Sequence, residues 1–317
     1  MSSSRFVSGY EFRAPVSDDL GAVVGVIAAE QSANGAAEAT LDADFMRQVW
    51  SSTGFDLATD AWVVTDAAGA IVAYGQAERE EPDLVESWGV VHPEHRGRGI
   101  GSALLEQIET RAAELLDGVP SPRFRHAITA GDGAVAMMLG RRGLRVVRHF
   151  WHMQIDLEDS TEPGTAPSGI EIDGVDPEED LPAIHAILEE AFADDWGDHP
   201  EPFDEWIEEL AGSPDDVALW LLARDEGTPV GVLTARSGDE VVWVNWLAVL
   251  ATHRGRGIGA ALLRRSFASF AARGLRRVRL NVDAENATGA TGLYERVGMR
   301  VVNRWDLWER SGADRTV

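Results

Sequence analysis

The sequence predicts an α/β (α+β) chain built from two similar domains in tandem. The heptapeptide HRGRGIG occurs at residues 95–101 and again at 253–259, and the expected elements around both copies follow the same order. A segment with the composition of a linker separates the two halves. A chain of 317 residues is long enough for two domains of ordinary size. We therefore expect domains over 1–156 and 170–317, joined by a linker at 157–169.

The first half alternates between helical and strand-like patterns. Apolar residues three and four positions apart favour helix, and short runs rich in β-branched and aromatic residues favour strand. The patterns predict helices near 19–31 and 42–51, strands near 61–66, 70–78 and 84–91, a helix opened by glycines at 96–117, a strand at 123–129, a helix at 134–143 and a strand at 144–157.

The second half repeats this order. The segment LEDSTEPGTAPSG (157–169), which separates the halves, is rich in Pro, Gly, Ser, Thr and acidic residues and shows no apolar period. The patterns after it predict helices at 181–192 and 202–210, strands at 217–225, 230–236 and 241–250, a glycine-opened helix at 254–274, a strand at 276–283, a short helix at 287–298 and a last strand at 299–310.

Composition excludes several classes of function. The net charge is −25, so the chain would repel nucleic acid and anionic membranes and attract a cationic small molecule such as an amine, although acidity can equally serve solubility alone. The chain has no cysteine and no lysine, which excludes a thiol nucleophile and Schiff-base chemistry. No apolar run reaches the roughly 18 residues of a membrane span. We expect a cytoplasmic protein, monomeric or homodimeric, that acts on a small molecule.

Each heptapeptide lies between an expected strand and an expected helix. The first turn of a helix carries N–H groups without intrahelical partners, and glycines let an anion approach this backbone closely. Two arginines in each copy can add charge-assisted hydrogen bonds. The pattern predicts a phosphate site, the alternative being a glycine-rich turn without a ligand. Its G-x-G-x-G spacing differs from the G-x-G-x-x-G of dinucleotide folds, and the P-loop would need a lysine.

These motifs together resemble the GNAT acetyltransferase superfamily. The resemblance rests on R-x-x-G-x-G after a strand that ends in LAV, followed by Asn286 and by LYERVGM at 293–299. It covers nearly the whole chain as two GNAT domains in tandem, and EAFADDWG at 190–197 is similar to tandem GNAT proteins of the mycothiol synthase type. The resemblance implies two mixed, mostly antiparallel twisted sheets flanked by helices, each splayed between its fourth and fifth strands to hold acetyl-CoA.

The resemblance also implies which residues would bind acetyl-CoA. The pyrophosphate would lie on the backbone of the heptapeptide, and the pantetheine arm would pair with the preceding strand as an added strand does. In the second half these residues are Leu247, Ala248, Val249, Arg254, Gly255, Arg256, Gly257, Ile258, Gly259 and Asn286. The matching residues of the first half are Val90, Val91, Arg96, Gly97, Arg98, Gly99 and Gly101.

Direct acetyl transfer requires a proton acceptor for the amine and a proton donor for the thiolate of CoA. Tyr294 matches the superfamily tyrosine and is the candidate acid, whereas the first half has Leu139 at this position. We therefore expect catalysis in the second half. The strand before the second heptapeptide lacks the glutamate that many GNAT enzymes use as a base, so Asn245, through a bound water, and Asp283 are the candidates. Glu86 occupies the matching strand of the first half.

The remaining expectations concern the acceptor and metals. Carboxylates and an aromatic face would suit a cationic amine, and a run of such residues follows the helix at 181–192. This run contains Asp194, Asp195, Trp196 and Asp198. The histidines show no metal-ligand spacing, so we expect no metal.

The function expected from the sequence is acetyl-CoA-dependent N-acetyl transfer to the primary amine of a small, cationic molecule. One alternative is a tandem GNAT protein that binds or senses CoA without turnover. A second alternative is acetylation of a protein N-terminus or peptide, which would require a long open groove. A free-CoA release assay over several amines discriminates among the three.

Overall fold

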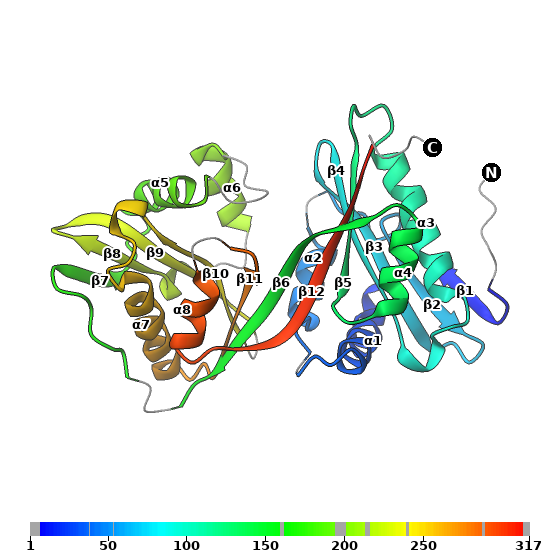
Figure 1. The fold of residues 1–317 in the computed structure, drawn as a ribbon, viewed down its shortest axis with the longest axis horizontal. Helices are drawn as coiled ribbons and strands as arrows, with labels where there is room; N and C mark the ends of the chain where they lie inside the picture. Colours follow the sequence, from blue (N-terminus) through cyan, green and yellow to red (C-terminus); the bar gives the residue numbers. More distant parts are fainter. Residues whose placement is uncertain are drawn as a thin grey trace. The chain divides into compact units, whose positions relative to one another are not determined.

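A computed structural model describes the fold of residues 7–37, 39–52, 54–158, 162–193, 201–212, 216–238, 241–286 and 289–312 (Figure 1). Contacts divide the chain into two compact units. The first unit comprises the chain up to Trp151, together with Asp283–Glu285 and the chain from Val302 onward. The second unit comprises His152–Val282 and Asn286–Val301.

The sheet of the first unit has the strand order β1-β2-β3-β4-β5-β12. All neighbouring strands in it are antiparallel except β4 and β5, which run parallel. The elements that begin in this unit are β1 (Tyr10–Arg13), the 3-10 turn η1 (Ser17–Asp19), α1 (Leu20–Ala33), α2 (Ala43–Trp50), β2 (Ala61–Asp66), β3 (Ile71–Glu81), β4 (Leu84–Val91), η2 (Pro93–His95), α3 (Ile100–Leu115), β5 (Arg123–Thr129), α4 (Gly133–Arg141) and β6 (Arg145–Asp156).

Helices cover both faces of this sheet because its strands alternate apolar side chains between the two faces. Val64 and Ala73 belong to the apolar cluster that contains residues of α3 and α4. Their neighbours Val63 and Tyr74 belong to the cluster of α1 and α2. The first unit is therefore a mixed sheet between two helical layers.

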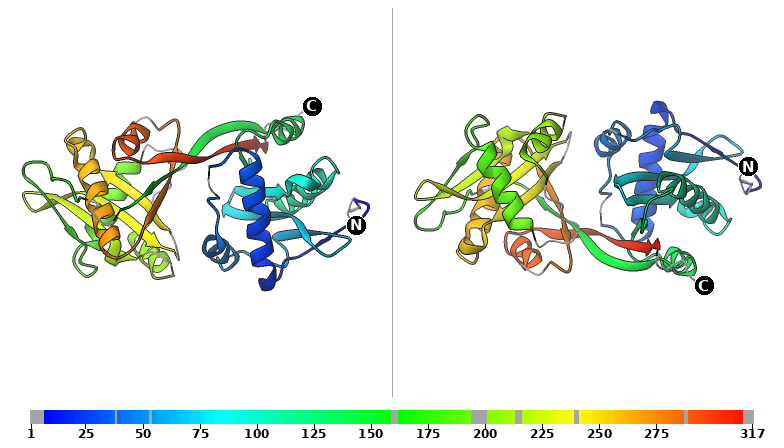
Figure 2. Two further views of the ribbon diagram at one scale, coloured as in Figure 1. Left: turned by 90° about the horizontal axis from the view of Figure 1, so that it is seen from below. Right: turned by 90° about the horizontal axis from the view of Figure 1, so that it is seen from above.

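The second unit repeats the plan, with the strand order β7-β8-β9-β10-β11-β6. Strands β7 to β10 pair antiparallel, and β10 pairs parallel with β11. Figure 2 shows α5 and α7 on opposite faces of this sheet. The elements are β7 (Ile170–Gly174), α5 (Leu181–Phe192), α6 (Phe203–Gly212), η3 (Val217–Leu219), β8 (Leu221–Asp225), β9 (Thr228–Ser237), β10 (Val242–Val249), η4 (Ala251–His253), α7 (Ile258–Ala272), β11 (Arg277–Asp283), α8 (Ala290–Arg296) and β12 (Arg300–Ser311).

The last strand does not follow the boundary expected from the sequence. Residues Trp305–Ser311 of β12 pair antiparallel with β5 in the first unit, although they follow the second half along the chain. The end of β6, from His152, belongs in turn to the second unit. The predicted strands at 144–157 and 299–310 are both long and mix apolar with polar residues, so local sequence gives no reason to assign either strand to one sheet rather than the other. The sheet architecture, mixed and mostly antiparallel with flanking helices, is confirmed.

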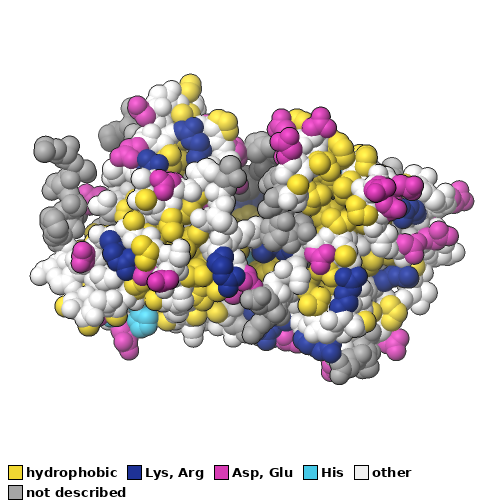
Figure 3. All heavy atoms as spheres, turned by 180° about the vertical axis from the view of Figure 1, so that it is seen from behind, with side chains coloured by type: hydrophobic (Ala, Val, Ile, Leu, Met, Phe, Trp, Pro, Cys, Tyr) yellow, Lys and Arg dark blue, Asp and Glu magenta, His cyan; other side chains and the backbone are white. Residues whose placement is uncertain are grey.

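Charged side chains are spread over the surface. Figure 3 shows acidic side chains interspersed with arginines on one face, in keeping with the net charge of −25. Among the described helices, none is both long and apolar enough to cross a membrane.

Candidate active site

The two heptapeptides have nearly the same backbone conformation. Gly97 and Gly255 both have φ +76°, and Gly99 and Gly257 have φ +89° and +84°. These are left-handed conformations that favour glycine, and Gly99 and Gly257 are the N-caps of α3 and α7. Each turn therefore ends in a helix whose first N–H groups have no intrahelical partner.

The third glycine of each copy allows close packing of the helix against the preceding strand. A Cβ atom at Gly101 would lie 3.6 Å from Cγ2 of Val91 on β4. A Cβ atom at Gly259 would lie 3.2 Å from Cδ2 of Leu293 on α8 and 3.8 Å from Cδ2 of Leu247 on β10. In the second unit, the start of α7 is thus packed against both β10 and α8.

The strands beside the turns differ between the two units. In the second unit, the parallel pairing of β10 with β11 ends at Val244↔Leu280. The pairing of β10 with β9 shifts register at Asn245, a β-bulge, and then continues from Trp246 to Val249. Residues Leu247, Ala248 and Val249 therefore pair with β9 but have no partner in the β10–β11 register, which leaves one edge of this backbone available to an extended ligand.

The first unit has this arrangement only in part, because Gly89, Val90 and Val91 also pair with β3 alone but no β-bulge directly precedes them. Its β4 strand stays in continuous register with β3 through Glu86, Ser87 and Trp88. The parallel pairing of β4 with β5 extends to Trp88↔Ala127, and Trp88 precedes its heptapeptide by as many residues as Trp246 precedes the other copy. The two strands therefore remain paired farther toward the turn than β10 and β11 do. Val90 is buried in the core and Val91 is half-buried.

Tyr294 lies on α8, directly after Leu293, which packs against Gly259 at the start of α7. Its side chain is 8% exposed, and burial raises the pKa of Tyr294 to about 12. Within the described residues its hydroxyl has no hydrogen-bond partner. A phenol in this setting stays protonated at neutral pH and can donate a proton. Leu139, the counterpart in α4, is fully buried in the apolar core of the first unit.

The β-bulge places Asn245 beside an exposed aromatic side chain. Trp246 is 50% exposed, although it belongs to a central strand. The centroid of its ring lies 5.0 Å from that of Phe192 at the end of α5. The backbone N–H of Trp246 donates to Oγ1 of Thr234 at 3.1 Å.

The arginines of the second turn have different partners. Arg254 donates from Nε to the Val249 carbonyl and from Nη2 to the Ala191 carbonyl, both at 3.0 Å. Arg256 donates to Oδ2 of Asp225 at 2.6 Å, with Nε2 of His253 at 3.4 Å from the same oxygen. The Arg256 hydrogen bond lowers the pKa of Asp225. Arg254 thus contacts only carbonyl oxygens among the described residues and retains its positive charge beside the turn.

The corresponding arginine of the first turn faces carboxylates. Arg96 lies 3.5 Å from Oε1 of Glu30 and 3.5 Å from Oδ2 of Asp132. Burial raises the pKa of Glu30, while hydrogen bonds and the Arg96 charge oppose this rise. Arg98 donates to the Tyr10 hydroxyl at 2.8 Å. The two turns therefore share their backbone but not their electrostatics.

The candidate bases other than Asn245 are held by arginines. Oδ2 of Asp283 lies 3.3 Å from Nε of Arg148, and Oδ1 of Asp283 accepts from the Glu285 N–H at 2.7 Å. The contacts of Asp283 group it with the first unit, whereas Tyr294 belongs to the second. Glu86 in the first unit accepts from Nη1 of Arg125 at 2.9 Å. Asn286 follows β11 in the second unit, and its carbonyl accepts from the Gly289 N–H at 3.4 Å.

Four expected acceptor residues, Asp194, Asp195, Trp196 and Asp198, lie outside the described residues. The described ranges contain no group of three or more His, Asp or Glu side chains that could hold a metal ion.

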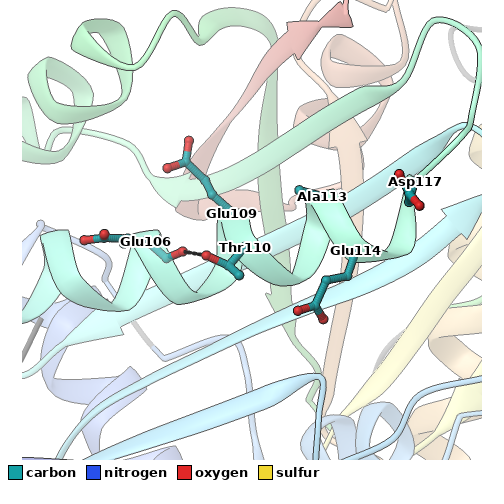
Figure 4. A pocket seen from close by; sticks show the side chains of 6 residues that line it. All are labelled: Glu106, Glu109, Thr110, Ala113, Glu114 and Asp117. Carbon is teal, nitrogen blue, oxygen red and sulfur yellow. Dashed lines mark hydrogen bonds between the residues drawn. The ribbon is translucent and has the colours of Figure 1, made fainter. Parts of the chain in front are cut away.

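A separate acidic hollow lies along α3 (Figure 4). One of its carboxylates, Glu109, pairs with Arg142 and Arg310, and another, Glu114, pairs with Arg111. This hollow is a charged helix face rather than part of the site.

Sequence reasoning missed the residues that distinguish the two turns. Glu30 comes ten residues after Leu20 at the start of α1, and Ala191 comes ten residues after Leu181 at the start of α5. Aligning these two helices would have shown a carboxylate in one half and a methyl group in the other. The exposed Trp246 could not be distinguished from its counterpart Trp88, which packs against Tyr74 with ring centroids 5.1 Å apart.

A mixed sheet that splays beside a glycine-led helix, with a tyrosine on the next helix, defines the class of CoA-dependent acetyltransferases. The GNAT acetyltransferase family matches residues 181–299, and a GNAT acetyltransferase domain matches residues 58–130. The chain belongs to the GNAT family and is an N-acetyltransferase, as the motifs indicate. Members of this family generally take the acetyl group from acetyl-CoA and pass it to small-molecule acceptors.

The relatives found by sequence are mycothiol acetyltransferases. A mycothiol acetyltransferase of Cellulomonas flavigena is 31% identical over 257 residues, which span 75% of this chain and 71% of the relative. A mycothiol acetyltransferase of Thermobispora bispora is 32% identical over 246 residues, 74% and 77% of the two chains. Similarity to proteins of the mycothiol synthase type is thereby confirmed.

Solved structures agree with this assignment. A GCN5-related N-acetyltransferase from Sphaerobacter thermophilus has a TM-score of 0.83 at 32% identity, with 96% of each chain covered. A tandem GNAT protein from the clavulanic acid biosynthesis pathway has a TM-score of 0.66 at 16% identity over 95% of this chain and 98% of that one, which shows the fold alone.

Proposed function

We propose that the second unit transfers the acetyl group of acetyl-CoA to the primary amine of a small, cationic molecule. The observation that carries this proposal is the parting of β10 from β11 at the Asn245 bulge, in the unit that also contains the second glycine turn and Tyr294. A phosphate site, an open strand edge and a buried proton donor are the three features that a CoA thioester requires.

In the second unit, different residues bind the pyrophosphate and the pantetheine arm of acetyl-CoA. The N–H groups from Arg254 to Gly259 hold the pyrophosphate, with the Arg254 charge beside them. The open edge of Leu247–Val249 holds the pantetheine arm by strand-like hydrogen bonds. Acetyl-CoA supplies an activated thioester that needs no enzyme nucleophile.

Two proton transfers remain for the protein. Tyr294 gives its proton to the leaving thiolate, since burial keeps the phenol neutral. Asn245, at the bulge, orders a water that takes the proton of the amine. We prefer this water to Asp283 because the Asp283 carboxylate pairs with Arg148 and its contacts group it with the first unit, whereas Tyr294 belongs to the second.

The acceptor is proposed from charge and from the relatives. The relatives are mycothiol acetyltransferases by name, and we infer chemistry of the mycothiol synthase type, acetylation of a cysteinyl amine, as one candidate for this chain. The net charge of −25 and the acidic run after α5 favour a cationic amine. Cysteinyl pseudosaccharides, polyamines and aminoglycosides are the acceptors that we infer to be worth comparing first.

The test is release of free CoA from acetyl-CoA over that panel of amines and over peptides with a free N-terminus. We expect release that depends on one class of amine and that is paired with a product heavier by one acetyl group. Binding of acetyl-CoA without release for any amine would instead identify a CoA-binding or CoA-sensing protein, which the missing base glutamate favours. Release only with peptides would support acetylation of protein N-termini.

A separate prediction concerns the acidic run. Replacing Asp194, Asp195 and Asp198 together by Asn should raise KM for a cationic amine by about tenfold and leave KM for acetyl-CoA unchanged. The difference in amine KM between the parent chain and this variant should shrink at high salt if these carboxylates attract the amine over a distance. Initial rates measured at low salt and at 0.5 M salt test this long-range attraction, because the screening length falls to about 3–5 Å at 0.5 M. An unaltered amine KM would assign these carboxylates to the solvated surface.

A further inference from the structure

The first arginine of the first glycine turn, Arg96, faces carboxylates of the chain itself. Glu30 of α1 is 7% exposed and accepts a hydrogen bond from Oγ1 of Thr129 at 2.8 Å. Thr129 is the last residue of β5, so this bond links α1 to the end of that strand. The other carboxylate oxygen of Glu30 faces Arg96 of the turn at 3.5 Å and accepts a hydrogen bond from the Asn34 amide.

A second carboxylate completes this cluster. Asp132 is the N-cap of α4 and accepts from the N–H groups of Ala134 and Val135, both at 3.1 Å. Its other oxygen lies 3.5 Å from Nη1 of Arg96. One guanidinium thus faces two largely buried carboxylates, and a third anion placed at this turn would be repelled at short range and low dielectric.

The second turn has neither carboxylate. Ala191 occupies the position of Glu30, and Arg254 contacts its backbone carbonyl instead of a side chain. The helix that corresponds to α4 is α8, whose N-cap is Gly289. Among the described residues, no acidic side chain pairs with Arg254.

We infer that the chain binds a single molecule of acetyl-CoA, at the second turn, because Glu30 and Asp132 take the place of the pyrophosphate at the first. The pairing of β4 with β5 up to Trp88↔Ala127 agrees with this, since it extends two positions farther toward the turn than the pairing of β10 with β11 and leaves a shorter open edge for a pantetheine arm. This inference rests on the proposed function of the second turn. It makes one of the identical heptapeptides a ligand site and the other a turn whose first arginine is paired with the chain's own carboxylates.

Calorimetric titration with acetyl-CoA tests the inference on the full chain. The parent chain should bind one molecule, and Gly257→Glu should bind none. Adding Glu30→Gln and Asp132→Asn to Gly257→Glu should restore binding of one molecule at the first turn, with an affinity at least about tenfold above the detection limit at which Gly257→Glu shows none. Gln and Asn keep the hydrogen bonds to Thr129 and at the helix N-cap, so circular dichroism and thermal unfolding should show a folded protein.

The converse variant, Ala191→Glu, places a carboxylate at the position in the second unit that corresponds to Glu30. Ala191→Glu should weaken acetyl-CoA binding by at least about tenfold relative to Ala191→Gln, which has the same size without the charge.

Each outcome has a distinct meaning. Two molecules bound by the parent, or binding by Gly257→Glu that is lost when Gly99→Glu is added, would overturn the inference. A folded triple variant that binds nothing, or equal affinities of Ala191→Glu and Ala191→Gln, would overturn the role of the carboxylates. No binding by the parent would refute the proposed function itself.

Discussion

Gly257→Glu should lower acetyl transfer by at least about 10²-fold, in a chain that remains folded. The substitution places a side chain and a negative charge at the N-cap of α7, where the pyrophosphate is proposed to bind. Both effects act against the ligand, because the anion loses its close approach to the backbone and meets a like charge. The measurement is CoA release at saturating amine, together with acetyl-CoA affinity by calorimetry.

The first unit supplies a matched control for this variant. Gly99 is the N-cap of α3 with φ +89°, against +84° for Gly257, so Gly99→Glu imposes nearly the same backbone strain, about 1–2 kcal/mol. We expect Gly99→Glu to lower thermal stability while retaining most turnover per folded molecule. The reverse result, with Gly99→Glu inactive and Gly257→Glu active, would move catalysis to the first unit and make Glu86 the leading base.

Much of the fold could be predicted because it is encoded locally. The two heptapeptides are identical in sequence and nearly identical in backbone, since glycine positions and the start of a helix determine a turn over a few residues. The order of helices and strands follows from apolar periodicity in the same way. The resemblance to GNAT motifs then supplied the sheet architecture, which periodicity alone does not specify.

The partner of the last strand could not be predicted from local sequence. The predicted strands at 144–157 and 299–310 have similar patterns, and the choice of β5 as the partner of β12 depends on which sheet edge is open in the folded chain. The Asn245 bulge likewise depends on pairing between β9 and β10 and is absent at the matching position of β4. Such features are properties of strand pairs rather than of segments.

The site shows the same division between local and long-range information. Arg254 and Arg96 are equivalent in sequence, yet Arg96 faces Glu30 and Asp132 from two other elements. Asp283 seemed available as a base at the end of its strand, whereas Arg148, far away in the sequence, lies 3.3 Å from it. Motifs located the two glycine turns, and long-range contacts determined their electrostatics.

Tyr294→Phe should lower kcat on the order of 10²-fold and leave acetyl-CoA affinity nearly unchanged. Phenylalanine keeps the buried ring, and the hydroxyl has no hydrogen-bond partner among the described residues, so the loss should be confined to proton donation. The pKa of about 12 adds a pH signature. A tyrosine at its ordinary value would lose its proton near pH 10, whereas the parent chain should show no decline of kcat from this group until about pH 12.

Tyr74→Phe is the matched control for this last variant. Tyr74 is also fully buried with a raised pKa, but it lies in the first unit, where its hydroxyl bonds with Trp50 and Gln76 at 2.8 Å each. Its loss should lower stability by about 1 kcal/mol and leave kcat unchanged. Rates must be compared where chemistry limits turnover, shown by insensitivity to solvent viscosity. If kcat of Tyr294→Phe then equals that of the parent, Tyr294 is not the acid, and the thiolate must leave without its proton.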